Sequence, residues 1–343
     1  MHRFKTIAIP ALKFSLPVLI VGWLLSSISA SDWNELNSRP KQWDRLVFAF
    51  LLTFGGVVGT YFRWYMLVRT LDLPFRIGDA LRLGFLGYLL NFVSLGSVGG
   101  DLFKAIFIAR EQTARRAEAV ASVIADRVIG LYALLVLASS TTLSGTLSGT
   151  LSGQSELLKR VGQMTLLMTA TGALMVFLFA KIPVEKLTTT LGRFPLRIGA
   201  VSRRLVEALA LYRRSPKVVA VALAVSVVTH GMFVVALHLI ASGILEASPT
   251  LAEHFLIGPV AFVAGAVPFM PAGLGALELA LDVMYTKVSS ADLAAGLGVV
   301  VALGHRLNTI GVATVGAIIY WLSKREVDEL LSLGEEVSGS SME

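Results

Sequence analysis

Four charged side chains inside apolar sequence are the residues best suited to chemistry in this chain. Asp101 and Glu278 each follow a glycine-rich stretch, and Arg127 and Arg306 follow them 26 and 28 positions later. Arg306 is flanked by uncharged residues over 293–303 and 307–322. An ionisable group within a membrane span costs about 2.5–3.5 kcal/mol on insertion scales, so four at matched places indicate a function.

These residue types allow two interpretations. Each carboxylate can cap a half-helix, because a helix N-terminus favours negative charge. Each can also pair with an arginine, either within its own half (Asp101 with Arg127, Glu278 with Arg306) or crosswise. A guanidinium binds phosphate bidentately, and backbone N–H groups at a glycine break suit the same anion. We therefore predict a site for a lipid phosphate, with purely structural caps and ion pairs as the alternative.

Five weaker candidates lie close to these four residues in the sequence. Asp126 and His305 directly precede the two arginines, and neighbouring helix positions point in different directions. His305 can titrate near neutral pH, although a structural histidine is the commoner case. Lys104 can pair with Asp101 or lie at the interface, and Asn91 and Asn308 are the weakest candidates.

The composition predicts an all-α, polytopic membrane protein. Of 343 residues, 55% are hydrophobic and 15% are charged, against about 45–50% and about 25% in soluble domains. Long apolar stretches predict spans at about 12–30, 46–68, 118–141, 162–181, 217–243 and 292–322. The first stretch also resembles a signal peptide, but we favour an uncleaved span.

Several site classes have no support in this sequence. Cysteine is absent, the five histidines lack zinc-ligand spacing, and no P-loop, dinucleotide or nucleophile motif occurs. We therefore expect no metal, no cofactor and no enzymatic activity. The net charge of +7 comes from segments between the apolar spans, which favours contact with anionic lipid over nucleic acid.

Two further apolar regions, 80–108 and 253–286, are interrupted by glycine or proline. The segment 181–217 has nine basic and two acidic residues, which predicts a cytoplasmic location, whereas 142–158 and 244–254 have no Lys or Arg and are expected outside. Counted from a cytoplasmic N-terminus, the number of membrane crossings agrees with these loop placements only if both interrupted regions are re-entrant hairpins. The first hairpin would enter from the cytoplasm and the second from outside. Such hairpins imply a central cavity, because non-helical backbone at membrane depth must be covered by protein or water. The predicted breaks are Gly96, Gly99, Gly100, Pro268, Pro271, Gly273 and Gly275.

Each half of the chain then reads span, span, hairpin, span, in opposite orientations. This order predicts an inverted repeat, with repeat one at about 10–141 and repeat two at about 160–322. Residues 1–322 would form one transmembrane domain, and 323–343 a short cytoplasmic tail. Both termini are expected in the cytoplasm of a cell (inner or plasma) membrane. The segment 195–217 predicts an interfacial amphipathic helix.

The stretches GSVGGDLFKA (96–105), ADRVIGLY (125–132), PFMPAGLGALE (268–278) and GHRLN (304–308) resemble the lysylphosphatidylglycerol synthase transmembrane-region family. That family usually has a proline before its first glycines, and Leu95-Gly96-Ser97 has none. The resemblance implies lipid translocation, with Asp101, Arg127, Glu278 and Arg306 in the lipid pathway. Only a short acidic tail follows Arg325, so we expect the soluble synthase domain to be missing and no aminoacylated lipid to be made.

We therefore expect a flippase or scramblase for a phosphate-bearing lipid. Its partners would be membrane lipids and a separate lipid-modifying enzyme. The alternatives are a membrane-embedded transferase acting on lipid-linked substrates, and an accessory subunit of a lipid synthase or glycosyltransferase.

Overall fold

The computed structural model describes residues 26, 30–93, 98–147, 156–191, 196–266, 275–287 and 293–322. Its long helices are α3 (Trp43–Thr70), α6 (Arg116–Leu147), α7 (Glu156–Lys181), α10 (Pro216–Ile244) and α13 (Leu297–Leu322). All five are long and apolar enough to cross a membrane. They confirm an all-α, polytopic membrane fold, and they match five of the predicted spans. The predicted span at 12–30 lies outside the described residues, apart from Ser26 and Ala30.

The polar segment after the third predicted span differs from expectation. We predicted a loop over 142–158, but α6 continues to Leu147, and 148–155 lies outside the described residues. The Thr142 hydroxyl donates to the Ala138 carbonyl at 2.9 Å, and the Ser144 hydroxyl donates to the Thr141 carbonyl at 3.0 Å. Hydroxyls that bond within the helix in this way let a polar sequence remain helical.

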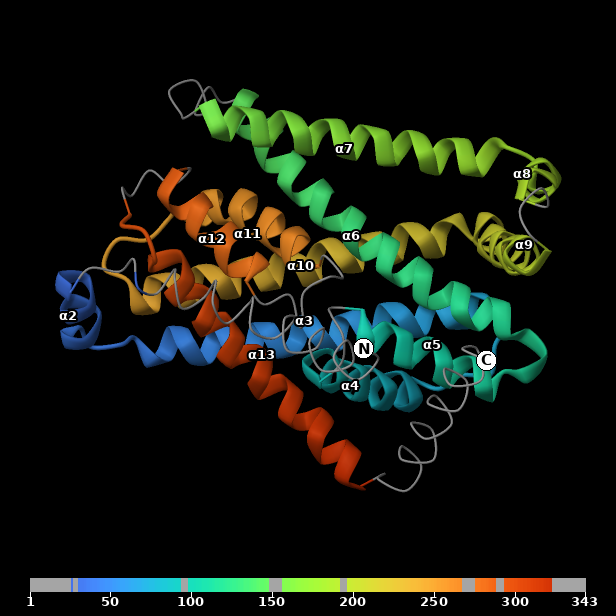
Figure 1. The fold of residues 1–343 in the computed structure, drawn as a ribbon, viewed down its shortest axis with the longest axis horizontal. Coiled ribbons are helices and arrows are strands. Elements are labelled where there is room, and N and C mark those ends of the chain that lie inside the picture. The colour runs from blue at the N-terminus through green and yellow to red at the C-terminus, as the bar shows by residue number, and fades with distance from the viewer. Residues whose placement is uncertain are drawn as a thin grey trace, which may run out of the picture.

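Two helical hairpins lie where the sequence is interrupted. The first consists of α4 (Ile77–Val93) and α5 (Gly99–Glu111), and the second of α11 (Leu251–Gly265) and α12 (Ala276–Lys287). At 1.5 Å per residue the longest limb measures about 25 Å, less than a hydrocarbon core of about 30 Å. The two hairpins enter the bundle from opposite ends (Figure 1).

The described hairpin ends show why glycine is needed there. Gly99 and Gly100 begin α5, and a Cβ on Gly100 would lie 2.1 Å from the Gly87 carbonyl oxygen of α4. Gly275 precedes α12 with a φ of 87°, in the left-handed region that favours glycine. Gly96, Pro268, Pro271 and Gly273 were also predicted as breaks, but they lie outside the described residues.

The helices around the hairpins pack in matched pairs. α3 packs along α10, α6 packs on α11, and α13 packs on α4. Each hairpin also contacts the span that follows it, since α5 packs on α6 and α12 packs on α13. This arrangement agrees with two related halves, whereas the inverted repeat and its boundaries stay a prediction.

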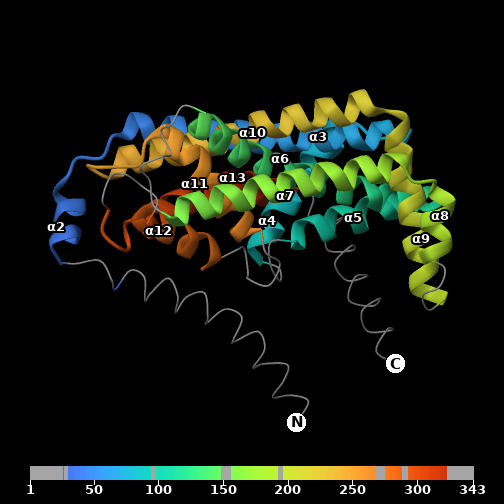
Figure 2. The same ribbon diagram turned by 90° about the horizontal axis from the view of Figure 1, so that it is seen from above.

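Short helices lie at the two ends of the bundle. α2 (Ala30–Ser38) lies at one end, and α8 (Val184–Leu191) and α9 (Leu196–Ala210) lie across the other (Figure 2). The 3₁₀ turn η1 (Thr113–Arg115) joins α5 to α6, and η2 (Leu211–Arg214) joins α9 to α10. The amphipathic helix predicted over 195–217 therefore comprises α9, η2 and the start of α10. The predicted tail, 323–343, lies outside the described residues.

Candidate functional site

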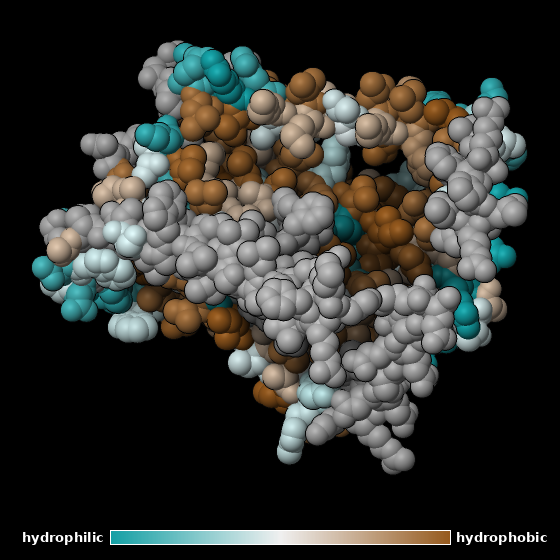
Figure 3. Space-filling model, viewed as in Figure 1, coloured by the Kyte–Doolittle hydropathy of each residue, from teal (hydrophilic) through white to brown (hydrophobic). Residues whose placement is uncertain are grey.

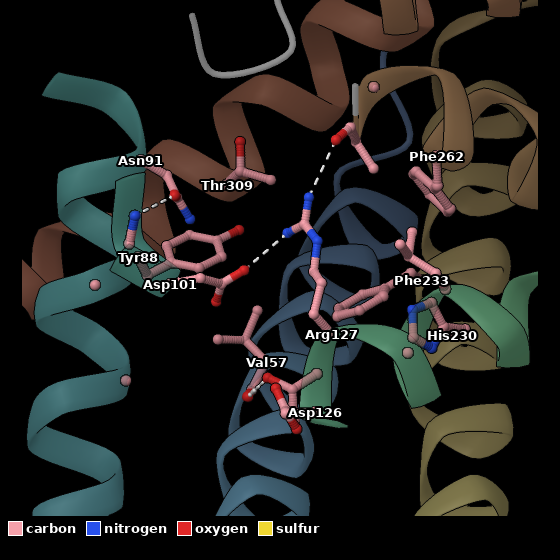
Figure 4. A pocket seen from close by; sticks show the side chains of 18 of the residues that line it. Val57, Tyr88, Asn91, Asp101, Asp126, Arg127, His230, Phe233, Phe262 and Thr309 are labelled. Carbon is pink, nitrogen blue, oxygen red and sulfur yellow. Dashed lines mark hydrogen bonds and ion pairs between the residues drawn. The ribbon is translucent and has the colours of Figure 1, made fainter. Parts of the chain in front are cut away.

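A cavity of about 350 Å³ lies in the middle of the bundle, where the two hairpins meet (Figure 4). The first hairpin contributes Asn91 at the end of α4 and Gly100 at the start of α5. The second contributes Gly265 at the end of α11 and Leu277 at the start of α12. Central residues of α3, α6, α10 and α13 complete the wall. The interruptions in the sequence therefore place helix ends against this space.

Arg127 of α6 connects the two hairpins across the cavity. Its Nη1 donates to Asp101 Oδ2 at 3.0 Å, and its Nη2 donates to the Ala266 carbonyl, beside the end of α11, at 3.1 Å (Figure 4). Lys104 Nζ lies 2.7 Å from the other oxygen of Asp101. The Arg127 side chain is 33% exposed, so one carboxylate holds two cations beside an accessible space.

Arg306 of α13 forms the second predicted pair. Its Nε donates to Glu278 Oε1 at 2.8 Å, and the Glu278 side chain is fully buried. Glu278 Oε2 also accepts the Gly275 N–H at 2.7 Å. Both interpretations of this carboxylate are therefore correct, because Glu278 caps the start of α12 and also pairs with Arg306. Each acid takes the arginine of its own half, which decides between the direct and the crossed pairs.

Asp126 has a partner that the sequence analysis missed. Arg63 Nε of α3 donates to Asp126 Oδ1 at 2.7 Å, and Arg63 Nη1 donates to Ser226 Oγ of α10 at 2.8 Å. The Arg63 and Asp126 side chains are both buried, and both residues line the cavity. The available signal was a charge between the uncharged stretch 46–62 and the apolar residues that follow it within one predicted span.

The remaining predicted residues have different surroundings. Asn91 Oδ1 accepts the Gly100 N–H at 2.8 Å and so ties α4 to the start of α5. His305 lines the cavity, its ring lies 5.4 Å from that of Phe262, and its Nδ1 has no hydrogen-bond partner among the described residues. Asn308 lies one turn further along α13, outside the cavity lining. His230 and Tyr88 also line the cavity, and neither was predicted, because a lone aromatic ring in an apolar span resembles ordinary packing.

The charges around the cavity favour an anion. The cations that line it are Arg63, Lys104, Arg127 and Arg306, and the carboxylates that line it are Asp101 and Asp126. With the fully buried Glu278, which pairs with Arg306, the difference is 4 − 3 = +1. Low-dielectric walls strengthen the field of such an excess charge. Over the described ranges, no group of three or more His, Asp or Glu side chains is arranged to hold a metal ion. The arrangement can bind a phosphate by charge and by guanidinium hydrogen bonds.

Comparison with known proteins gives one match. The family model for the lysylphosphatidylglycerol synthase TM region matches residues 10–317, which include every residue that lines the cavity. A comparison with curated protein sequences found no match.

Proposed function

We propose that this chain, which belongs to the family of the lysylphosphatidylglycerol synthase TM region, moves a phosphate-bearing lipid between the leaflets of a membrane. Its multi-pass helical architecture provides the membrane setting. The observation that carries the proposal is a cavity with excess positive charge between the ends of two hairpins that enter from opposite ends. The headgroup would cross through this cavity while the tails stay in the bilayer.

The hairpins support this route because they are too short to span. Re-entrant segments place helix ends near the membrane midplane, which is where transporters with inverted repeats bind their cargo. Asp101 lies in the first turn of α5 and Glu278 in the first turn of α12, so both acids stand at helix ends that face the cavity. We therefore interpret both hairpins as re-entrant, with a polar path between them.

Arg127 is the residue that we propose as the main phosphate ligand. It is more exposed than Arg306, whose side chain is only 13% exposed. A phosphate oxygen can replace the Ala266 carbonyl at Arg127 Nη2, while Asp101 keeps the guanidinium in place from the other side. Lys104 and Arg306 would add positive charge around the same space, and Glu278 would hold Arg306 in position.

The orientation follows from the basic residues at one end of the bundle. The region of α8, α9 and η2 carries Lys186, Arg203, Arg204, Arg213 and Arg214. Short basic segments remain in the cytoplasm, so we place this end there. The first hairpin then enters from the cytoplasm and the second from outside, and we propose that both termini are cytoplasmic in the inner or plasma membrane.

Lipid translocation can be measured in proteoliposomes that contain tail-labelled fluorescent lipids. We expect the protein to speed transfer of a phosphate-bearing lipid such as phosphatidylglycerol, and to leave a phosphate-free diacylglycerol analogue at the protein-free rate. Mass spectrometry of the lipids should show no change in their chemical structure. Equal rates with and without protein would contradict the proposal, and a new lipid species would favour a transferase instead.

A further inference from the structure

Near α8, helix α7 has a stretch, from Ala173 to Leu178, in which no side chain is buried against the other described residues. At its other end α7 contacts α6, where a Cβ on Gly162 would lie 2.6 Å from Thr142, and the Ser139 and Thr169 hydroxyls lie 2.7 Å apart. Beyond Gly172, the six consecutive side chains from Ala173 to Leu178 are all exposed. Since a helical turn takes 3.6 residues, these six cover every face of the helix.

α6 shows the same separation from its own side. Tyr132 packs against α7, since a Cβ on Gly172 would lie 2.7 Å from its ring. Val128 lies one turn earlier on the same face of α6, and it is 54% exposed. The two helices therefore diverge after the contact between Tyr132 and Gly172, and they leave apolar side chains facing a gap.

The space-filling view shows an opening that passes through the molecule below α7 (Figure 3). Figure 1 shows that α6 and α7 converge at one end of this region and that α8 and α9 lie at its other end. Apolar walls without neighbouring atoms lose their dispersion contacts, so in a membrane this space is filled. Because helices stand at both ends of this region, flexible acyl chains that enter sideways suit it better than a polypeptide helix.

Arg213 lies in η2, at the end of this opening. Its Nη1 donates to the Ile182 carbonyl at 2.8 Å, and its guanidinium carbon lies 4.4 Å from the centre of the Phe179 ring. Its Nε and Nη2 atoms are buried, and they have no hydrogen-bond partner within the described part of the chain. Lys181 Nζ, 5.9 Å from the Phe177 ring, adds a second positive charge nearby. Two guanidinium donors without an acceptor point to an anionic oxygen as the missing partner.

We infer that the opening between α6, α7 and α8–α9 holds one resident anionic phospholipid, with its phosphate on Arg213 and its two acyl chains against α7 and Val128. The lipid would complete the contact between α7 and the bundle. This site is separate from the central cavity and does not depend on the proposed transport activity.

Native mass spectrometry of the whole protein tests this site. Wild type and variants are exchanged into nanodiscs that contain equal amounts of phosphatidylglycerol and phosphatidylcholine, and the lipid that remains bound after release is counted. Wild type should retain one phosphatidylglycerol in preference to phosphatidylcholine. Arg213→Gln should lower its occupancy about tenfold, because hydrogen bonds from a charged donor are lost. Added inorganic phosphate should not displace the bound lipid.

Two further variants make the result decisive. Arg214→Gln removes the same charge from the next, exposed position and should leave occupancy unchanged. Val128→Trp fills the opening from an exposed position, so it should remove bound lipid without disturbing the core, as checked by size-exclusion profile and thermal stability. Equal losses in Arg213→Gln and Arg214→Gln, or wild-type retention in Val128→Trp, would overturn the inference. Filling of the opening by a second polypeptide would also overturn it.

Discussion

Replacing Arg127 with alanine is expected to lower translocation of a phosphate-bearing lipid by about 30-fold or more. Loss of the guanidinium removes a hydrogen bond between charged groups on the phosphate, worth about 1.5–3 kcal/mol, and about 1.4 kcal/mol corresponds to a factor of ten. In this protein the guanidinium spans both hairpins, from Asp101 to the Ala266 carbonyl, and it is the accessible arginine of the cavity. The measurement is the rate of fluorescent-lipid transfer in proteoliposomes.

The structure also predicts that this variant folds. Asp101 keeps Lys104 as a partner at 2.7 Å, so no buried carboxylate loses its only cation. Arg127→Lys should give an intermediate rate, because an ammonium preserves the charge but not the planar pair of donors. Arg160→Ala is the matched control, since Arg160 forms an exposed pair with Glu156 at 3.4 Å. A wild-type rate in Arg127→Ala, with Arg160→Ala also at wild type, would rule out the assigned role.

The second large effect concerns stability. Arg63→Met should lower the free energy of unfolding by about 3–5 kcal/mol, because it leaves the buried Asp126 carboxylate without its charged partner. The Ser226 hydroxyl would also lose the guanidinium donor that lies 2.8 Å away. The change in the free energy of unfolding can be measured in mixed micelles, by unfolding the protein with an increasing fraction of a denaturing detergent.

A double variant separates the loss of the pair from the loss of packing. Arg63→Met combined with Asp126→Leu removes both charges, and it should recover most of the stability, since apolar replacements of a buried pair are often neutral. Arg160→Met at the surface should change the free energy of unfolding by less than about 0.5 kcal/mol. The ion pair would not contribute the predicted stability if Arg63→Met were as stable as wild type. The same would follow if the double variant were no more stable than Arg63→Met.

The features that sequence predicted well are those with strong local signals. Long uncharged stretches located the described spans, and glycine and proline located the two interruptions. The pairs of Asp101 with Arg127 and of Glu278 with Arg306 were predicted because charges in apolar sequence need partners. Sequence alone could not separate these pairs from crossed ones, since that choice depends on how the hairpins lie relative to α6 and α13.

The features that sequence missed depend on contacts between distant segments. Arg63 meets Asp126 across 63 positions and Ser226 across 163, and nothing within α3 indicates either contact. Sequence showed that Arg306 lies deep in an uncharged stretch, but it did not show which arginine is more exposed. In the fold, Arg306 pairs with Glu278 and is 13% exposed, whereas the Arg127 side chain is 33% exposed. The packing of distant segments decides how far a side chain is exposed to a cavity. The position of the residue in the sequence does not reveal that packing.

The passage of a lipid headgroup through the central cavity is the claim on which this account depends. Photo-crosslinking with a phospholipid that carries a diazirine on its headgroup tests it most directly, with the modified residues mapped by mass spectrometry. If the headgroup passes through the cavity, crosslinks should form on residues that line it, such as Tyr88 on α4 and Thr309 on α13, and fewer should form when unlabelled phosphatidylglycerol competes. Crosslinks confined to the ends and outer faces of the bundle, with none in the cavity, would contradict it.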